Sequence, residues 1–249
     1  LSAALCLEGA RRLLGEDAPP LRSANITFVG AAGGDVDVNA SFLRRGKAMA
    51  FINSTVSRAD APATACTFLF GHPRVKSTID VGPETFVTPL PANLPGPDES
   101  PSLFEGFPER GPNTIFPPIF TQHVEMRLAS GAPPGSGSSI ADHFVWARHV
   151  GADANGGAGE GVHPEVALLA LGDTLPPAST SLFKAPAPVS STTWHVNVID
   201  TSPTAFEGGW WLLRTRAESA RLGYSSQDME LWGASGLIWV ERQCVAIYA

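Results

Sequence analysis

Residues 163–177 read HPEVALLALGDTLPP, and this stretch decides the fold. Pro164 suits the first position of a helix, where a backbone N–H would have no partner, and Glu165 suits the positive end of the helix dipole. The run that follows is apolar on every side, so a helix here must be buried. Pro176 and Pro177 end the helix and force the chain into an extended exit. The stretch therefore predicts a buried helix that begins at Pro164.

Segments with the pattern of β-strands lie on both sides of this helix. Residues 121–128 and 141–150 precede it, around a turn rich in Gly, Pro and Ser. Three or four strands follow it, at 190–199, 210–219, 224–232 and 237–247. A helix that is apolar on all sides needs such a sheet to cover it, so the second half of the chain predicts an α+β domain.

The first part of the chain has the same plan. Residues 2–15 predict one amphipathic helix, Pro19 and Pro20 force an extended exit, and four strand-like segments follow between residues 23 and 70. The two helix starts imply a repeat of roughly 160 residues. A buried helix wrapped by one curved antiparallel sheet is the hotdog arrangement, and the repeat predicts that it occurs twice.

The sequence thus predicts an α+β fold of two tandem hotdog domains, a double hotdog in which each long helix is wrapped by a curved antiparallel sheet. Residues 1–80 form the N-terminal domain, without the strands that precede the helix in the second copy. Proline recurs so often in residues 81–118 that no hydrophobic period survives, which predicts a linker or an arm. Residues 119–249 form the C-terminal domain, which carries the active site. Four phenylalanines favour an arm that lies against a surface: Phe86, Phe104, Phe107 and Phe116.

Composition narrows the class of partner. The 249 residues are 43% hydrophobic and carry a formal net charge of −7, which argues against nucleic acid or an anionic membrane as the main partner. No apolar run is long enough to cross a bilayer, so we expect no membrane partner. Cys6, Cys66 and Cys244 are scattered, without a CxxC pair, which favours reduced thiols and a cytoplasmic location.

Several kinds of chemistry lack their motif. Gly157, Gly159 and Gly161 stand between a strand and a helix, but the dinucleotide-binding spacing GxGxxG fails because residue 162 is valine. The six histidines form no HExxH motif, and no Cys/His cluster has the spacing of metal ligands. The chain also has no GxSxG motif, which would mark a serine hydrolase. We therefore expect no cofactor and no metal.

Asp173 is the most informative single residue. It ends the apolar helix, where the helix dipole disfavours a carboxylate. Burial and the dipole together would raise its pKa, and a raised pKa suits a base that activates water. The alternative is an ordinary loop aspartate, because aspartate is common in turns.

A series of short motifs runs along the chain. In the second half these motifs lie at 163–166, 171–176, 191–196, 211–213, 217–218, 223–224, 230–232 and 241–243, and in the first half at 20–28 and 43–47. In their order and spacing, the chain resembles the acyl-CoA thioesterase II family, which has a double-hotdog fold. The likeness covers most of the chain except the proline-rich middle, and the motifs of the first half fit the N-terminal copy.

This resemblance implies a set of site residues. Members of the family use an Asp, a Thr or Ser, and a Gln to orient a water molecule against a thioester carbonyl. Carried over by position, these residues are Asp173, Thr193 and Gln243, with Ser191 and Thr192 as alternatives for the hydroxyl. The turn before Leu237 is one residue short, and a slip of one residue would turn Gln243 to the other face of its strand.

The resemblance also implies the function: an acyl-CoA thioesterase that hydrolyses a fatty acyl-CoA to the free acid and CoA. The helix N-terminus at 163–166 is a candidate oxyanion site. Arg44, Arg45 and Lys47 either meet CoA phosphates or form a basic surface turn. Fold analogy predicts a homo-oligomer, a dimer or higher.

Two other functions stay open at this point. The first is a non-catalytic double hotdog that binds acyl-CoA or serves as an assembly module. The second is a hotdog hydratase or dehydratase, for which His163, at the start of the helix, is the residue to test.

Overall fold

A computed structural model describes residues 1–74, 76–85, 87–107, 117–151, 161–185 and 187–248. Its helices and strands are, in order, α1 (Ser2–Leu14), β1 (Leu21–Phe28), β2 (Asp37–Arg45), β3 (Met49–Arg58), β4 (Ala61–Gly71), β5 (Val124–Ser130), β6 (Asp142–His149), α2 (Pro164–Gly172), β7 (Val189–Val198), β8 (Trp211–Arg221), β9 (Tyr224–Gly233) and β10 (Gly236–Ile247). Short 3-10 helices are η1 (Pro83–Thr85), η2 (Pro97–Glu99), η3 (Ile119–His123), η4 (Ala178–Leu182) and η5 (Pro203–Phe206). Gly157, Gly159, Phe86 and Phe116, on which predictions were based, lie outside the described residues.

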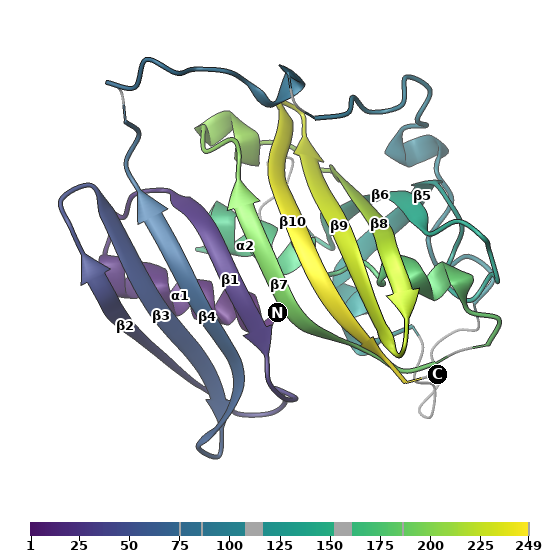
Figure 1. The fold of residues 1–249 in the computed structure, drawn as a ribbon, viewed down its shortest axis with the longest axis horizontal. Coiled ribbons are helices and arrows are strands. Elements are labelled where there is room, and N and C mark those ends of the chain that lie inside the picture. Colours follow the sequence, from purple (N-terminus) through teal and green to yellow (C-terminus); the bar gives the residue numbers. More distant parts are fainter. Residues whose placement is uncertain (75, 86, 108–116, 152–160, 186, 249) are drawn as a thin grey trace.

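In the described part of the chain, ten strands form one antiparallel sheet in the order β2-β3-β4-β1-β7-β10-β9-β8-β6-β5 (Figure 1). The strands before residue 80 form one half of this sheet and those after residue 119 the other. The halves meet where β1 pairs with β7, with Asn25 opposite His195. The predicted α+β arrangement is confirmed, with four strands in the first half, and four strands follow α2 where three or four were expected.

Both helices lie on the same side of the sheet (Figure 1). The helix α1 packs against β2, β3 and β4, and it also contacts α2. The helix α1 has 13 residues and α2 has 9, so the prediction of a long helix in each half is not confirmed. Gly15 (φ 90°) ends α1, and Gly172 ends α2 directly before Asp173.

The core lies between the sheet and the two helices. The buried face of α1 consists of small and apolar side chains, and α2 is buried on nearly all sides, as its sequence predicts. Between the helices, Arg11 Nη1 lies 2.6 Å from Glu165 Oε2. The other oxygen of Glu165 accepts a hydrogen bond from Leu21 N–H at 2.9 Å. One buried carboxylate therefore connects α2 to α1 and to β1.

Residues 101–103 of the proline-rich segment lie along the edge of the sheet beside β5. Leu103 N–H donates to Met126 O at 2.9 Å, and Leu128 N–H donates to Pro101 O at 2.8 Å. These bonds continue the ladder beyond β5, which is the last named strand on that side of the sheet. An uncovered edge strand is a template for aggregation, so the segment protects this edge. Within the described ranges, no helix is both long and apolar enough to span a membrane.

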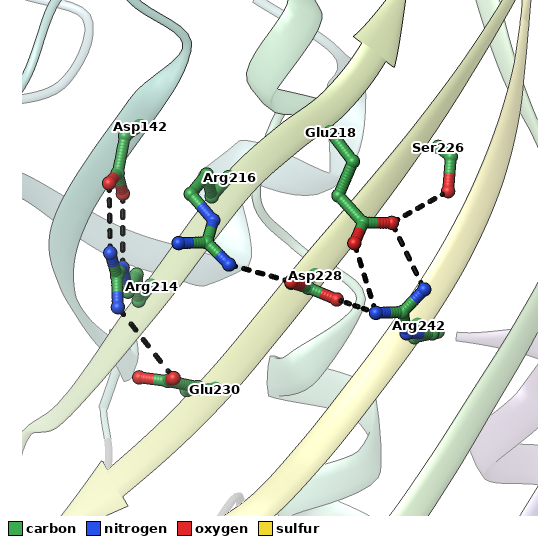
Figure 2. A network of polar contacts seen from close by, with 8 residues as sticks. All are labelled: Asp142, Arg214, Arg216, Glu218, Ser226, Asp228, Glu230 and Arg242. Carbon is green, nitrogen blue, oxygen red and sulfur yellow. Dashed lines mark hydrogen bonds and ion pairs between the residues drawn. The ribbon is translucent and has the colours of Figure 1, made fainter. Parts of the chain in front are cut away.

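Ion pairs connect neighbouring strands on the face of the sheet away from the helices (Figure 2). Arg242 on β10 lies 2.8 Å from Asp228 on β9, which in turn lies 2.8 Å from Arg216 on β8. Arg242 also contacts Glu218 at 3.0 Å. Each exposed pair contributes little stability, but opposite charges on paired strands favour one register. That register decides which side chains point inward.

Candidate active site

The C-terminal end of α2 comes unusually close to the sheet. A Cβ atom at Gly172 would lie 3.3 Å from Trp194 Cζ2 and 3.4 Å from Glu241 Oε1, which is tighter than ordinary contact. The glycine therefore allows this approach. The next residue, Asp173, caps the helix with φ −91° and ψ 12°, and its N–H bonds to Leu171 O. Because Asp173 directly follows Gly172, its carboxylate lies at the inner face of the sheet.

Gln243 meets this carboxylate from β10. Its Nε2 donates to Asp173 Oδ1 at 3.2 Å, and its side chain is buried. It lies between Trp194 on β7 and Gln227 on β9 in the ladder. The pairing of β10 with β9 shifts in register between Leu237 and Trp239. This irregularity follows the short turn and precedes Gln243. The structure brings together Asp173 and Gln243, as the family resemblance implies.

Asp173 has a pKa of about 6, well above its usual value of about 4. Burial raises it, and the hydrogen bond from Gln243 lowers it by a smaller amount. The rise has the direction expected from the sequence. At pH 7 the carboxyl is mainly ionised, yet it binds a proton far more readily than an exposed aspartate does.

Glu241 is a second buried carboxyl beside the first, and the sequence analysis did not single it out. Trp194 Nε1 donates to its Oε2 at 2.9 Å. Burial, together with the negative charge of Asp173, raises the pKa of Glu241 to about 8, so it is mainly neutral at pH 7. The signal was available, because residues two apart on a strand share a face and Gln243 was already a candidate.

Thr193 lies away from this pair. Its neighbour Trp194 points into the core, whereas Thr193 is exposed and pairs with Thr27 of the other half. The register of β7 shifts between Thr193 and Ser191, where Thr192 is the extra residue and its hydroxyl donates to Cys244 O at 3.0 Å. This bulge breaks the alternation that the carry-over assumes. The structure does not bring Thr193 to Asp173.

A pocket of about 520 Å³ opens beside Asp173, and Ser191 also lines it. Among the described residues that line the pocket, Asp173 is the one with a charged side chain. Most of the wall consists of aromatic rings and prolines, including Phe104, Phe107, Phe120, Phe183, Pro176 and Pro177. Such a lining favours an apolar ligand whose polar end reaches the carboxylate. Two of these rings come from the proline-rich segment, so the segment is part of the site.

The start of α2 lies far from this carboxylate. The helix has nine residues, so its ends are about 13 Å apart at 1.5 Å per residue. His163 there accepts a hydrogen bond from Glu165 N–H, and its pKa is lowered to about 4 by burial and by the charge of Arg11. The predicted oxyanion site at 163–166 is therefore too distant to assist a reaction at Asp173.

The basic residues of the first half are distant too. Arg44 and Arg45 lie on β2 and Lys47 follows it, and all three are exposed. Five strand spacings, about 24 Å, separate β2 from β10.

Among the described residues, no group of three or more His, Cys, Asp or Glu side chains is arranged to hold a metal ion.

Solved structures share this fold. A hotdog-fold protein from Alicyclobacillus acidocaldarius is 21% identical, with a TM-score of 0.76 over 99% of this chain and 85% of that one. The acyl-CoA thioesterase II TesB2 from Mycobacterium marinum is 15% identical, with a TM-score of 0.70 over 100% of this chain and 88% of that one. The α+β architecture is thus a hotdog fold.

The sequence profile of the acyl-CoA thioesterase C-terminal domain matches residues 91–247, which is more than half of the chain. The protein therefore belongs to the acyl-CoA thioesterase II family. No curated protein sequence matches it.

Proposed function

We propose that this protein is an acyl-CoA thioesterase that hydrolyses a fatty acyl-CoA to the free acid and CoA. The observation that carries the proposal is the Asp173 carboxylate, with a pKa of about 6, bonded to Gln243 at the wall of an apolar pocket. A thioester is already activated, so a positioned water and a general base are sufficient for its hydrolysis. The apolar wall fits the acyl chain.

In the proposed reaction, ionised Asp173 accepts a proton from water while the water oxygen bonds to the thioester carbonyl carbon. Gln243 Nε2 carries a second N–H, which donates to the water or to the carbonyl oxygen. Ser191, which lines the same pocket, supplies the third polar group in place of Thr193. As the C–S bond breaks, the proton passes from Asp173 to the departing thiolate, which leaves as CoA.

We also propose the organisation that the sequence predicts: two tandem hotdog domains at residues 1–80 and 119–249, joined by the arm at 81–118. The continuous sheet with one helix behind each half supports this division. The homo-oligomer and the cytoplasmic location stay predictions.

The test is steady-state hydrolysis of short-, medium- and long-chain acyl-CoAs, measured by the release of the CoA thiol. We expect turnover by the wild type and at least a 100-fold loss in Asp173→Asn, which keeps the shape of the side chain but cannot accept a proton. Wild-type inactivity with every chain length, combined with measurable acyl-CoA binding, would support the non-catalytic alternative.

A further inference from the structure

Behind Gln243, on the side away from Asp173, lies a second buried amide. Gln227 on β9 is the direct partner of Gln243 in the ladder, and both side chains are buried. Gln227 Nε2 donates to Gln243 Oε1 at 2.7 Å. Gln227 Oε1 accepts from the backbone N–H of Ala178, the first residue of η4, at 2.9 Å. Three hydrogen bonds thus connect this backbone N–H with the Asp173 carboxylate.

The direction of every bond in this chain follows from its first member. The N–H of Ala178 can only donate, so the atom of Gln227 that faces it must be oxygen. The NH₂ group of Gln227 then faces Gln243, whose nearer atom must also be oxygen. Gln243 is left with its own NH₂ group toward Asp173, where an ionised carboxylate can only accept. No other assignment of the two amides satisfies all three bonds.

We propose that Gln227 is a positioning residue that holds the Gln243 amide with its NH₂ group toward Asp173 and the pocket. This inference rests on the proposed thioesterase function. With the amide in this orientation, one N–H of Gln243 binds the carboxylate and the other is available to the reaction. In the flipped orientation a carbonyl oxygen would face the carboxylate, which would repel it and leave the substrate without a donor.

The nearby groups do not replace Gln227 in this role. Glu241 shares the inner face of β10, but its carboxyl is bonded to Trp194 Nε1. Ser225 lies two residues from Gln227 on the same face of β9, and its Oγ has no hydrogen-bond partner among the described residues. Gln227 is therefore the group that orients the Oε1 side of Gln243.

Gln227→Met removes the donor while it keeps the length and burial of the side chain. We expect kcat to fall at least tenfold while KM changes less than twofold, because the pocket is intact and the Gln243 amide is no longer fixed. The pKa of Asp173 should rise above about 6, since its hydrogen bond from Gln243 weakens. NMR titration of the Asp173 carboxyl carbon measures this pKa without any turnover.

Gln227→Glu is the conservative variant with a distinctive pH profile. A protonated carboxyl accepts from Ala178 N–H and donates to Gln243 Oε1, so it preserves the native orientation. Once ionised it only accepts and turns the NH₂ group of Gln243 toward itself. Because burial raises the pKa of the introduced carboxyl, activity should be near that of the wild type at low pH and fall at a higher pH where the wild type is unchanged.

Ser225→Ala is the matched control, since it changes a buried polar residue on the same face of β9 without touching the chain. Its kcat and Asp173 pKa should equal those of the wild type. If circular dichroism shows that Gln227→Met does not fold, the pH profile and the Asp173 titration of Gln227→Glu test the positioning role of Gln227. An unshifted Asp173 pKa in Gln227→Met, or no added alkaline loss in Gln227→Glu, overturns the role of Gln227. Wild-type inactivity overturns the thioesterase function instead, and the titration of Asp173 still tests Gln227.

Discussion

Asp173 combines a position at the end of a helix with a carboxyl that is partly withdrawn from water, and this sets the expected pH dependence of the reaction. Only the ionised form accepts a proton, and the pKa is about 6. We therefore expect kcat/KM to fall about tenfold per unit as the pH drops below 6, and to level off above 7. A pH–rate profile between 4.5 and 8 measures this. A profile that is flat between pH 5 and 7 would contradict the assignment of Asp173 as the base.

Two residues of β7, Ser191 and Thr193, are candidates for the hydroxyl of the site, and their variants can be compared. Ser191 lines the pocket with Asp173, whereas Thr193 is exposed. We expect Ser191→Ala to lower kcat at least tenfold, about 1.4 kcal/mol of transition-state stabilisation, because a donor to the water is lost. Thr193→Ala should stay within twofold of the wild type. The same steady-state assay on both variants shows which hydroxyl acts in the reaction. A larger loss in Thr193→Ala than in Ser191→Ala would support Thr193, the residue that the family resemblance implies.

At the scale of the residue, the structure brings together two of the three site residues that the family resemblance implies, and two further buried side chains, Glu241 and Gln227, were not singled out from the sequence. Asp173 and Gln243 could be placed because a helix end and a strand register are local properties. Thr193 was chosen from position alone, and the bulge at Thr192 depends on pairing with β10, which no local pattern reports. Glu241 and Gln227 have no strong motif. Their importance depends on hydrogen-bond partners that are 16 to 49 residues away in the chain.

Among the elements, the close approach of α2 to the sheet determines where Asp173 lies. Gly172→Ala would add a methyl group 3.3 Å from the Trp194 ring. The higher helix propensity of alanine contributes about 0.5–1 kcal/mol, but overpacking costs about 1–3 kcal/mol. We expect a net loss of about 1 kcal/mol in urea denaturation and a lower kcat, because the helix end must move away from Gln243.

Gly33→Ala is the control for this substitution, since a methyl group at Gly33 would meet no atom within 4 Å. It should leave both the free energy of unfolding and kcat unchanged. If Gly172→Ala were as stable and as active as this control, the close approach would have no role in placing Asp173.

The elements themselves were largely predictable, but the expectation of a long helix in each half was not confirmed. Strand alternation and proline pairs gave every strand of both halves within a few residues. The length of α2 depends instead on contacts at its two ends, where Gly172 must fit against Trp194 and Glu165 must reach Leu21. The ladder that residues 101–103 add to β5 was also beyond the sequence, because proline density conceals short stretches of pairing.

Contacts on the sheet and behind it hold the two halves of the molecule together. On the sheet, β1 pairs with β7 through five residue pairs, and His195 Nδ1 lies 2.6 Å from Asn25 Oδ1. Behind the sheet, Arg11 and Glu165 connect the helices. A repeat in the sequence predicts two similar units but does not tell whether they share a sheet. That depends on pairing between strands about 170 residues apart, for which neither strand alone has a signal.

The buried pair of Arg11 and Glu165 tests how strongly the halves depend on each other. Arg11→Met leaves the Glu165 carboxyl buried without its cation, and burial already raises its pKa. Breaking one side of a buried pair costs about 3–5 kcal/mol. We expect a loss of this size in urea denaturation at pH 7, and a smaller loss at pH 5, where protonation of Glu165 removes the uncompensated charge.

The double variant Arg11→Met with Glu165→Gln separates charge from packing. The glutamine oxygen can still accept from Leu21 N–H, and no buried charge remains, so most of the lost stability should return. If the halves form one cooperative unit, all these variants unfold in a single transition by fluorescence and by circular dichroism. Two separate transitions in Arg11→Met alone would mean that the ion pair, and not the β1–β7 ladder, couples the halves. A double variant as unstable as Arg11→Met would show instead that lost packing, and not the unpaired carboxylate, causes the destabilisation.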